Sequence, residues 1–237
     1  MALREKLNKL KNYDTPSVTN VVASYPDAPK YCLRLYDAWH GKWYTDQRLK
    51  CMFPELGPVA GLAVTCTYNL PGSGKQALSI REILREKVEA DAPVILAIDQ
   101  DMPEDIRSRN GLCGGNMMTV FQKAGCVGVL TNGPSRDVDE IRTMGMQYML
   151  TGVCAGHGNF ELTAVNTSVE ICGMQVQAGD VIHMDENGAV KFPLEYLDQV
   201  LEGLEQLSAR ERECQARMRQ AADIEEAADI IESLLSE

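Results

Sequence analysis

Residues 114–140 read GGNMMTVFQKAGCVGVLTNGPSRDVDE, and this stretch decides the fold that we expect. After the glycine pair, MMTVFQKAG has the pattern of a helix that ends at Gly125. CVGVLTNG has the pattern of a buried strand, and the helix VDEIRTMG that follows is closed by Gly145. A helix, a buried strand and a second helix in this order are typical of a parallel crossover unit.

The same alternation extends over residues 92–152. APVILAID (92–99) predicts a buried strand before the glycine pair, and MQYMLTG (146–152) predicts another strand after the second helix. The residues between the first strand and the glycine pair predict a loop. The middle of the chain therefore predicts a parallel sheet with helical connections.

The flanking segments complete an α/β fold. Helices are expected over residues 1–12, from a Thr15 cap to Ser24, over SIREILREKVEA, and from Pro193 to the end. Strands are expected at VAGLAVTCTY (59–68) and, in a compact β segment, at TSVEICG, MQVQAGDVIHMD and GAVKFP. PGSGK (71–75) fails the spacing of a phosphate loop and predicts a turn. We expect one α/β domain over residues 1–205, with an aromatic-rich excursion at 26–53, and a helical extension over 206–237.

The composition excludes several function classes. The chain has 237 residues, with 34 acidic against 23 basic side chains and a net charge of −11. Such a surface repels phosphate backbones, so we expect no nucleic acid as partner. The absence of an apolar run of about 18 residues excludes a membrane span, and the charged N-terminus does not resemble a signal peptide, so we expect a cytoplasmic protein. The eight cysteines form no CxxC pair, which favours buried free thiols.

A glycine at a fixed distance from an Arg-Asp pair is the candidate site. Gly115 is followed by twenty residues, then Arg136 and Asp137, and after two more residues Glu140. Backbone N–H groups at a glycine-led helix start can hold an anion, and Arg136 offers a planar fork for a carboxylate. Asp137 is a suitable ligand for a hard divalent cation. Both loops follow buried strands, at the sheet edge where α/β proteins bind ligands.

Each of these residues also has a purely structural interpretation. Asp137 and Glu140 have the spacing of a capping box at the start of the helix VDEIRTMG, and Arg136 would then be a solvated surface residue. His157, in CAGHGNF, is a candidate acid, base or substrate contact, or else a loop histidine that bonds local backbone. Cys113 lies near the glycine turn, but no adjacent base identifies it as a nucleophile.

Taken together, these residues resemble one family. The chain is similar to the family shared by the regulator of ribonuclease E activity and the 4-hydroxy-4-methyl-2-oxoglutarate aldolases, some of which carry an older methyltransferase label. The family motif is a glycine, twenty residues, Arg-Asp, two residues and an acid, as at Gly115, Arg136, Asp137 and Glu140. The similarity covers residues 12–205, with flanking matches at ELGPVAGLAVT (55–65), AGCVGVLTNGPSRDV (124–138) and GMQVQAGDVIHMDENGAVKFP (173–193).

The resemblance implies a swivelling β/β/α-type domain that assembles into a trimer or a hexamer, and a class II pyruvate aldolase mechanism. By position, Arg136 would bind the pyruvyl group, Asp137 would ligate Mg²⁺ or Mn²⁺, and Glu140 would position a metal-bound water. The chain departs from the family at the long excursion, at the helix after residue 205, and at Asn20, where the first helix often carries an acid.

The resemblance also places the substrate carboxylate on backbone N–H groups that follow Gly115, at Asn116 and Met117. In the family, a neighbouring subunit can contribute further acids. The candidates for additional acids in this chain are Asp99, Asp101 and Asp180. For Asp180 and Asp185 we favour a turn-forming role.

The resulting interpretation is a metal-dependent carbon–carbon lyase that cleaves or decarboxylates a small 2-keto acid through a pyruvate-type enolate, as an aldolase or an oxaloacetate decarboxylase does. A divalent cation and an arginine would stabilise the developing oxyanion, so no Schiff-base lysine is needed. Two alternatives stay open: a non-catalytic protein-binding regulator on the same fold, and a hydratase or isomerase that uses the same platform.

Overall fold

The structure is a computed structural model that describes residues 1–25, 29–86 and 92–236. The chain divides into two compact units. The first unit is formed by Met1–Thr15 and Lys42–Leu194, and the second by Pro16–Gly41 and Glu195–Glu237.

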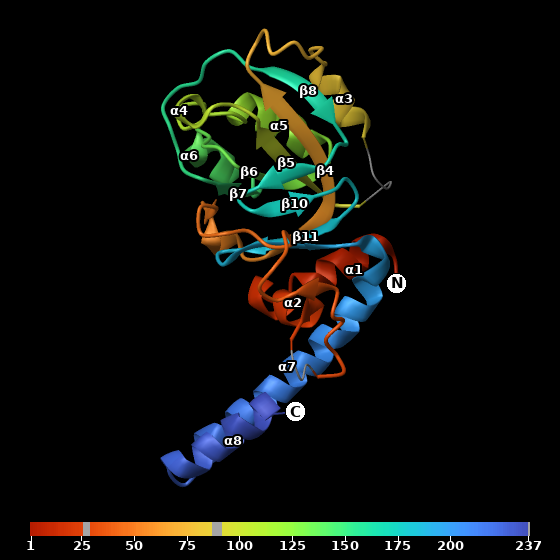
Figure 1. Ribbon diagram of the computed structural model, residues 1–237, viewed down its shortest axis with the longest axis vertical. Helices are drawn as coiled ribbons and strands as arrows, with labels where there is room; N and C mark the ends of the chain where they lie inside the picture. The colour runs from red at the N-terminus through yellow and green to blue at the C-terminus, as the bar shows by residue number, and fades with distance from the viewer. Residues whose placement is uncertain (26–28, 87–91, 237) are drawn as a thin grey trace. The chain divides into compact units, whose positions relative to one another are not determined.

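A mixed sheet is the framework of the first unit (Figure 1). Within the described residues it has eight strands, in the order β12-β11-β4-β5-β6-β7-β3, with β8 paired to β4. The neighbours from β4 to β7 are parallel, and the other pairings are antiparallel. The strands are β3 (Lys50–Cys51), β4 (Val59–Asn69), β5 (Val94–Gln100), β6 (Cys126–Thr131), β7 (Gln147–Leu150), β8 (Glu161–Val165), β11 (Val181–Asp185) and β12 (Gly188–Phe192).

The predicted α/β fold, including its parallel crossover units, is confirmed. Helix α5 connects β5 to β6, and α6 connects β6 to β7. Gly125 and Gly145 follow these two helices with φ of 90° and 67°, a left-handed conformation that favours glycine. The helical segments of the first unit are α1 (Leu3–Leu10), η1 (Pro54–Leu56), α3 (Ile80–Arg85), α4 (Glu104–Arg107), α5 (Gly115–Lys123) and α6 (Val138–Thr143).

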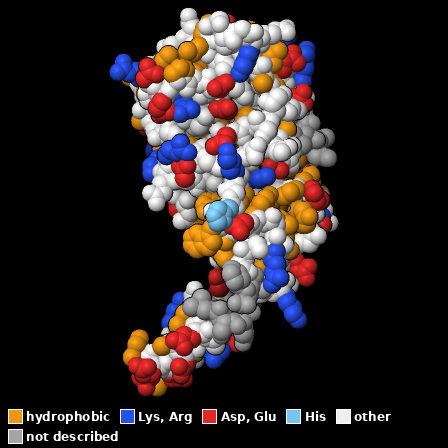
Figure 2. All heavy atoms as spheres, viewed as in Figure 1, with side chains coloured by type: hydrophobic (Ala, Val, Ile, Leu, Met, Phe, Trp, Pro, Cys, Tyr) orange, Lys and Arg blue, Asp and Glu red, His pale blue; other side chains and the backbone are white. Residues whose placement is uncertain are grey.

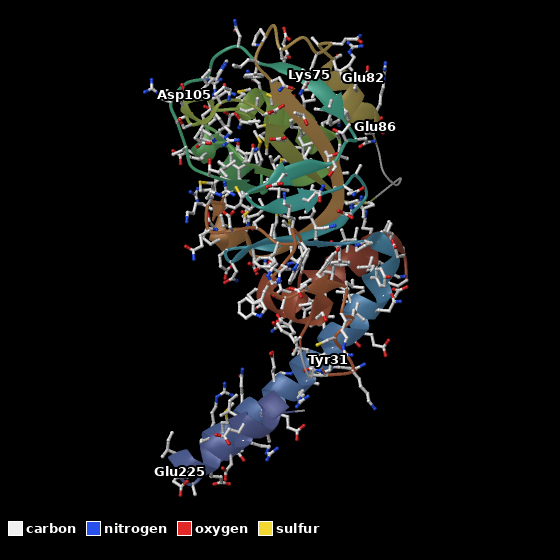
Figure 3. The ribbon with its side chains drawn as sticks, viewed as in Figure 1. Tyr31, Lys75, Glu82, Glu86, Asp105 and Glu225 are labelled. Carbon is white, nitrogen blue, oxygen red and sulfur yellow. The ribbon has the colours of Figure 1, made fainter. Side chains whose placement is uncertain are left out.

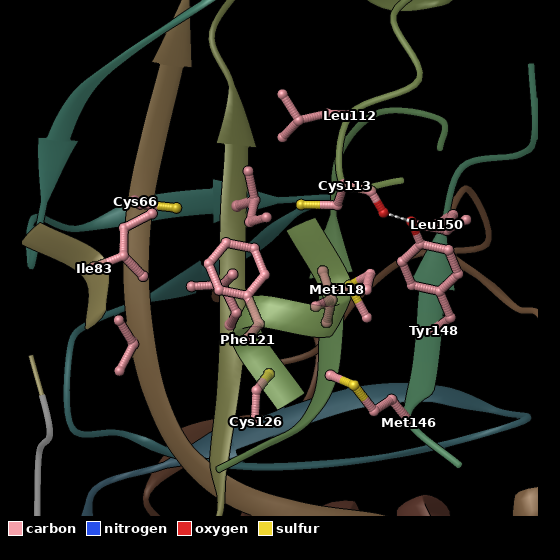
Figure 4. Close-up of a cluster of buried hydrophobic side chains, with 14 of the residues drawn as sticks. Cys66, Ile83, Leu112, Cys113, Met118, Phe121, Cys126, Met146, Tyr148 and Leu150 are labelled. Carbon is pink, nitrogen blue, oxygen red and sulfur yellow. Dashed lines mark hydrogen bonds between the residues drawn. The ribbon is translucent and has the colours of Figure 1, made fainter. Parts of the chain in front are cut away.

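Two apolar clusters cover opposite faces of the parallel strands. Leu96 and Ile98 of β5 belong to one cluster with Phe121 of α5 and Tyr148 of β7. Phe121 and Tyr148 are labelled in Figure 4. Ile95 and its alternate neighbours pack into the second cluster, together with the hairpin of β9 (Val169–Ile171) and β10 (Met174–Val176). Because successive side chains of a strand point to opposite faces, a strand buried on both faces is a continuous apolar run, as the sequence of β5 indicated.

Three predictions about the elements need correction. ELTAV was not predicted as a strand, yet it forms β8 and pairs with β4 across an irregular register. The expected loop after β5 contains the short helix α4, which begins after Pro103. The expected helix SIREILREKVEA is described as α3 only to Arg85, and residues 87–91 lie outside the described part of the chain.

The aromatic excursion at 26–53 does not pack as one aromatic group. It is divided between the two units, and residues 26–28 lie outside the described part. Trp43 is buried and meets the ring of Tyr44 edge-on, with 4.6 Å between the ring centroids. Trp39 in the second unit is 88% exposed, so its indole contributes little to any core.

The second unit is mainly helical. A Cβ on Gly203 would lie 2.7 Å from Cγ1 of Val21, so the absence of a side chain at Gly203 allows the helix that carries it to approach Val21 closely.

Among the described residues, no helix combines the length and the apolar character that a membrane span requires. The elements of this unit are α2 (Thr15–Val22, whose first residue belongs to the first unit), β1 (Ala23–Ser24), β2 (Tyr36–Asp37), η2 (Leu194–Tyr196, which begins at the end of the first unit), α7 (Leu197–Gln220) and α8 (Ile224–Ser236). Helix α7 crosses residue 205, and the domain limits that we expected there stay a prediction.

Thr15 does not act as the predicted cap, because its side chain has another partner. Its hydroxyl lies 2.9 Å from Nδ1 of His183, and Nε2 of the same ring lies 3.3 Å from the carbonyl oxygen of Leu10. A carbonyl can only accept, so Nε2 carries the proton and Nδ1 accepts from Thr15. Burial lowers the pKa of His183, against the opposing effect of the Asp185 carboxylate, so this fully buried ring is neutral.

We predict that His183 makes the first unit less stable in acid. Because the pKa of the folded state lies below the unfolded value of about 6.5, the stabilising contribution is complete above that value and falls as the pH decreases below it. One such group changes the free energy of unfolding by at most about 1.4 kcal/mol per pH unit. The free energy of unfolding, measured by chemical denaturation between pH 7.5 and pH 5, should depend less steeply on pH in His183→Gln than in the wild type. His157→Gln, at an exposed ring, should keep the wild-type slope, and equal slopes for all three proteins would contradict the prediction.

Candidate active site

The structure brings the four motif residues of the sequence together in the first unit. Gly115 is the first residue of α5, and Glu140 lies in the first turn of α6. Arg136 and Asp137 lie in the loop that joins β6 to α6. The two loops follow the carboxyl ends of the adjacent parallel strands β5 and β6, the edge at which α/β proteins bind ligands.

The two glycines leave room for acidic and basic side chains at the positions that a Cβ would occupy. On Gly114, a Cβ would overlap Oδ2 of Asp137 and would lie 2.9 Å from Nε of Arg136. On Gly115, it would overlap the carboxylate of Glu140. The side chains of Arg136, Asp137 and Glu140 therefore pack directly against the glycine pair.

Asp137 contacts the start of α5 rather than the start of its own helix. Its carboxylate accepts a hydrogen bond from the backbone N–H of Gly115, with an N···O distance of 2.9 Å, and it makes no capping bond to α6. The residue has a left-handed backbone with φ of 59°, a conformation that aspartate tolerates better than most residues. The expected capping role at α6 is thus wrong, and Asp137 instead joins the two halves of the site.

Arg136 has an unsatisfied donor. Its Nε is buried and makes no hydrogen bond among the described residues, although Oδ2 of Asp137 lies 3.5 Å away. The side chain as a whole is 35% exposed, so the end of the guanidinium group is accessible. A buried donor without a partner destabilises the folded chain by about 1–3 kcal/mol, and such groups are typical of sites that bind a ligand.

The first turn of α5 offers two further donors. The N–H of Met118 bonds the carbonyl of Gly114 at 3.1 Å, and the N–H of Gly115 is bonded to Asp137. The N–H groups of Asn116 and Met117 have no acceptor among the described residues. They lie at the positive end of the helix dipole, where a carboxylate is stabilised.

The residues present fit a magnesium or manganese ion held partly by water. The carboxylates of Asp137 and Glu140 both lie against the glycine pair, and Oδ2 of Asp137 also lies 3.5 Å from Nε of Arg136. Mg²⁺ is commonly held by one or two carboxylates with several waters. Within the described residues no group of three or more His, Cys, Asp or Glu side chains forms a complete metal cage.

Asp99 is not part of this arrangement. It precedes Gln100 on β5 and so points to the opposite face, whereas the Gln100 side chain bonds the carbonyl of Pro134 and the amide of Asn110. Asp99 accepts from Asn132 at 2.6 Å, and burial raises the pKa of its carboxyl group. It lines a separate cavity of about 480 Å³, whose described lining is Arg48, Lys50, Asp99, Glu104, Arg107, Asn132, Thr151, Glu170, Cys172 and Gly173.

His157 has the bonding of an ordinary loop histidine. Its exposed ring lies with Nδ1 2.8 Å from the carbonyl of Gly158. The loop contacts the segment before the glycine pair, where the carbonyl of Gly156 accepts from the N–H of Gly111 at 3.0 Å. A catalytic role for His157 stays a prediction without a partner to support it among the described residues.

The remaining acids have structural partners. Asp101 pairs with Lys75 at 3.1 Å, which restrains the PGSGK turn. Lys75 lies in the segment between β4 and α3 (Figure 3). Asp180 accepts from the N–H of Gln177, and Asp185 accepts from the N–H of Asn187, as expected of turn-forming residues. On the face of the first unit seen in Figure 2, lysine and arginine side chains alternate with acidic ones.

All eight cysteines are free, and six of them are buried, as expected. Burial raises the pKa of the Cys113 thiol well above its ordinary value. A protonated and inaccessible thiol is a poor nucleophile, so a nucleophilic role for Cys113 has no support.

Sequence reasoning did not identify Ser135 and Tyr148. The phenol of Tyr148 bonds the carbonyl oxygen of Cys113 at 2.5 Å (Figure 4) and contacts the Ser135 hydroxyl, which also bonds the carbonyl oxygen of Leu112. The available signal was the tyrosine itself, because a buried phenol in an apolar strand needs a hydrogen-bond partner.

Comparison with known proteins agrees with this architecture. Residues 33–191 match the family model described as RraA-like, Aldolase/RraA, which is more than half of the chain. The chain belongs to the RraA-like family. The expected family is thereby confirmed, and it includes both aldolase-type enzymes and regulators without catalytic activity.

Individual relatives are distant. The chain is 30% identical over 101 residues to the uncharacterized protein MJ0644 of Methanocaldococcus jannaschii, a match that spans 42% of this chain and about half, 49%, of that protein. An uncharacterized protein from Pseudomonas syringae pv. tomato superposes with a TM-score of 0.69 and 18% identity, over 96% of this chain and 94% of its own. RraAS2 of Streptomyces coelicolor, described as an unusual member of the RNase ES inhibitor RraA family, superposes with a TM-score of 0.65 and 19% identity, over 91% and 98%. At such identities these structures show the shared fold.

We predict that Gly115→Ala disrupts the site while the core stays folded. The added methyl group would overlap the Glu140 carboxylate and displace it from the glycine turn. Isothermal titration with Mn²⁺ should show at least a tenfold loss of affinity, as for a lost oxygen ligand or a misplaced one. Gly152→Ala is the matched control, because its Cβ would meet nothing within 4 Å. Equal Mn²⁺ affinity for both variants would contradict the prediction.

Proposed function

We propose that this protein is a divalent-metal-dependent lyase that releases pyruvate, or a close analogue, from a small 2-keto acid. The observation that carries the proposal is the convergence of Arg136, Asp137 and Glu140 on the glycine turn of α5. Family membership supports it in part, because the family contains aldolases as well as regulators.

Each residue of the site would have a distinct task. The free N–H groups of Asn116 and Met117 would bind the substrate carboxylate at the start of α5. The guanidinium of Arg136 would bind the keto oxygen, and its unsatisfied Nε would gain an acceptor as that oxygen acquires negative charge.

The carboxylates of Asp137 and Glu140 would hold Mg²⁺ or Mn²⁺, directly and through water. When bound, the cation supplies Lewis-acid stabilisation of negative charge on the keto oxygen. Asp137 would also hold the glycine turn beside the arginine loop through its bond to the N–H of Gly115. Cleavage of the C3–C4 bond of a 4-hydroxy-2-oxo acid, in which the C4 hydroxyl group loses its proton and becomes a carbonyl, would leave the enolate of pyruvate. Loss of carbon dioxide from oxaloacetate would leave the same enolate, and in both cases C3 then takes up a proton.

A non-catalytic regulator is the second candidate. The family includes regulators, and RraAS2 is described as a member of an RNase inhibitor family. A regulator does not require a free arginine donor and two convergent carboxylates, so these groups favour the lyase. Hydratase and isomerase activities would use the same groups, and product analysis distinguishes them.

We predict metal-dependent pyruvate release from a panel of 4-hydroxy-2-oxo acids and oxaloacetate. Asp137→Asn should abolish the response to Mg²⁺, and Arg136→Lys should lower kcat about a hundredfold, since lysine keeps the charge but loses the fork. A lactate dehydrogenase-coupled assay with Mg²⁺ or EDTA measures both effects. Asp139→Asn, on the same helix α6, is the matched control and should keep wild-type activity.

The outcomes separate the candidates. Full activity in EDTA, or in Asp137→Asn, would contradict the metal role. If the wild type releases pyruvate from none of the substrates, the lyase proposal fails and a regulator becomes the better explanation.

We also propose that the protein self-associates, as a trimer or a hexamer. The two carboxylates of the site leave most of a cation's coordination to water, and a neighbouring copy could supply the additional acid that the described residues lack. Light scattering at micromolar concentration should give a mass of three or six chains. A monomer would contradict this proposal.

A further inference from the structure

The carbonyl groups that Ser135 and Tyr148 bond are those that the two free N–H groups at the start of α5 would bond in a longer helix. In a regular α-helix, each N–H bonds the carbonyl of the residue four positions earlier. For Asn116 and Met117 those carbonyls belong to Leu112 and Cys113. The Leu112 carbonyl is bonded by the Ser135 hydroxyl, and the Cys113 carbonyl is bonded by the Tyr148 phenol at 2.5 Å.

The backbone between them is held in an uncommon conformation. Cys113 has φ of 63°, so the chain turns out of the helical path immediately before the glycine pair. Such a conformation in a residue other than glycine is destabilising and persists only where the surroundings enforce it. The two hydroxyls provide this enforcement, because they bond the carbonyls on either side of the turn.

Ser135 belongs to the loop that carries the other half of the site, and Tyr148 belongs to the next strand, β7. Ser135 directly precedes Arg136, and its backbone is fixed by bonds to Gly152 and Cys154 at 3.1 and 2.9 Å. Tyr148 is fully buried in β7, where it stacks against Phe53 with 6.1 Å between the ring centroids. The pair thus ties the glycine turn to the arginine loop through buried bonds, in addition to the bond from Gly115 to Asp137.

We propose that Tyr148 and Ser135 are positioning residues that keep the N–H groups of Asn116 and Met117 available to a substrate carboxylate. They do so by bonding the two carbonyls that these N–H groups would meet in a longer helix. The inference rests on the proposed lyase function for the identity of the anion, and on the geometry alone for the placement of the turn.

The two hydroxyls act as one unit. They contribute two protons to three short contacts, so the contact between them and both carbonyl bonds cannot all be hydrogen bonds at the same time. A change in either hydroxyl therefore redistributes the bonds of the other. Removal of both hydroxyls should raise KM by a factor well below the product of the two factors for the single variants.

Kinetics of Tyr148→Phe, Ser135→Ala and the double variant test the proposal. A carboxylate is held in the bound substrate and in the transition state alike, so KM should rise tenfold or more with a smaller change in kcat. The double variant should resemble the more affected single variant. A merely structural role would lower the amount of folded protein and leave KM unchanged. Tyr68→Phe is the matched control, because Tyr68 is buried in the same cluster and its hydroxyl makes no hydrogen bond among the described residues.

Amide hydrogen exchange of residues 112–118 provides a readout that does not depend on activity. The N–H groups of Gly115 and Met118 should exchange faster in Tyr148→Phe and in Ser135→Ala than in the wild type or in Tyr68→Phe. Unchanged exchange in both variants overturns the inference, and so does an unchanged KM in an active enzyme. If the wild type is inactive, the lyase proposal fails, and exchange alone decides whether the pair positions the turn. If Tyr148→Phe does not fold, Ser135→Ala supplies both measurements.

Discussion

The contact between the glycine turn of α5 and the carboxylate of Asp137 is the constraint on which the site depends. Both glycines lack a side chain where the acidic and basic groups of the neighbouring loop lie, and the N–H of Gly115 bonds Asp137 directly. The spacing of the motif follows from this contact. A helix, a turn and a strand must fit between the two loops, and α5 and β6 have the lengths that bring Gly115 back beside Asp137.

Arg136 shows how such a site differs from ordinary surface. Its buried Nε has no hydrogen-bond partner among the described residues, which reduces stability, and a folded chain seldom keeps such a group without a functional reason. The pair formed by Ser135 and Tyr148 shows the complementary arrangement, with polar groups fully buried and bonded at the back of the same turn. The turn is therefore held by bonds from buried hydroxyls, while Arg136 and the first turn of α5 keep donors without an acceptor among the described residues, as preorganised binding requires.

The elements with strong periodicity could be predicted from sequence, and those fixed by tertiary contacts could not. The strands β5, β6 and β7 are continuous apolar runs closed by turn residues, so their identity and parallel order followed from local pattern. β8 has no such pattern, because its five residues are mostly half-buried and it is a strand through pairing with β4. The role of Asp137 was ambiguous for the same reason: a capping box and a bond to a distant helix have the same local sequence. Ser135 and Tyr148 are thirteen residues apart along the chain and meet only after β6 and β7 pair.

The ends of the strand order in the main sheet restrict how copies of this chain can meet. At one end, β3 has only two residues and carries an exposed lysine, Lys50. At the other end, the chain around Trp43 and Thr45 bonds the outer edge of β12, through Lys191 at 3.0 Å and Ala189 at 2.9 Å. Neither end offers a long row of free N–H and C=O groups, so strand addition from a second molecule is disfavoured. Growth by strand pairing is therefore suppressed at both of these ends, and a contact made there between copies would use side chains, which sequence change can adjust one residue at a time.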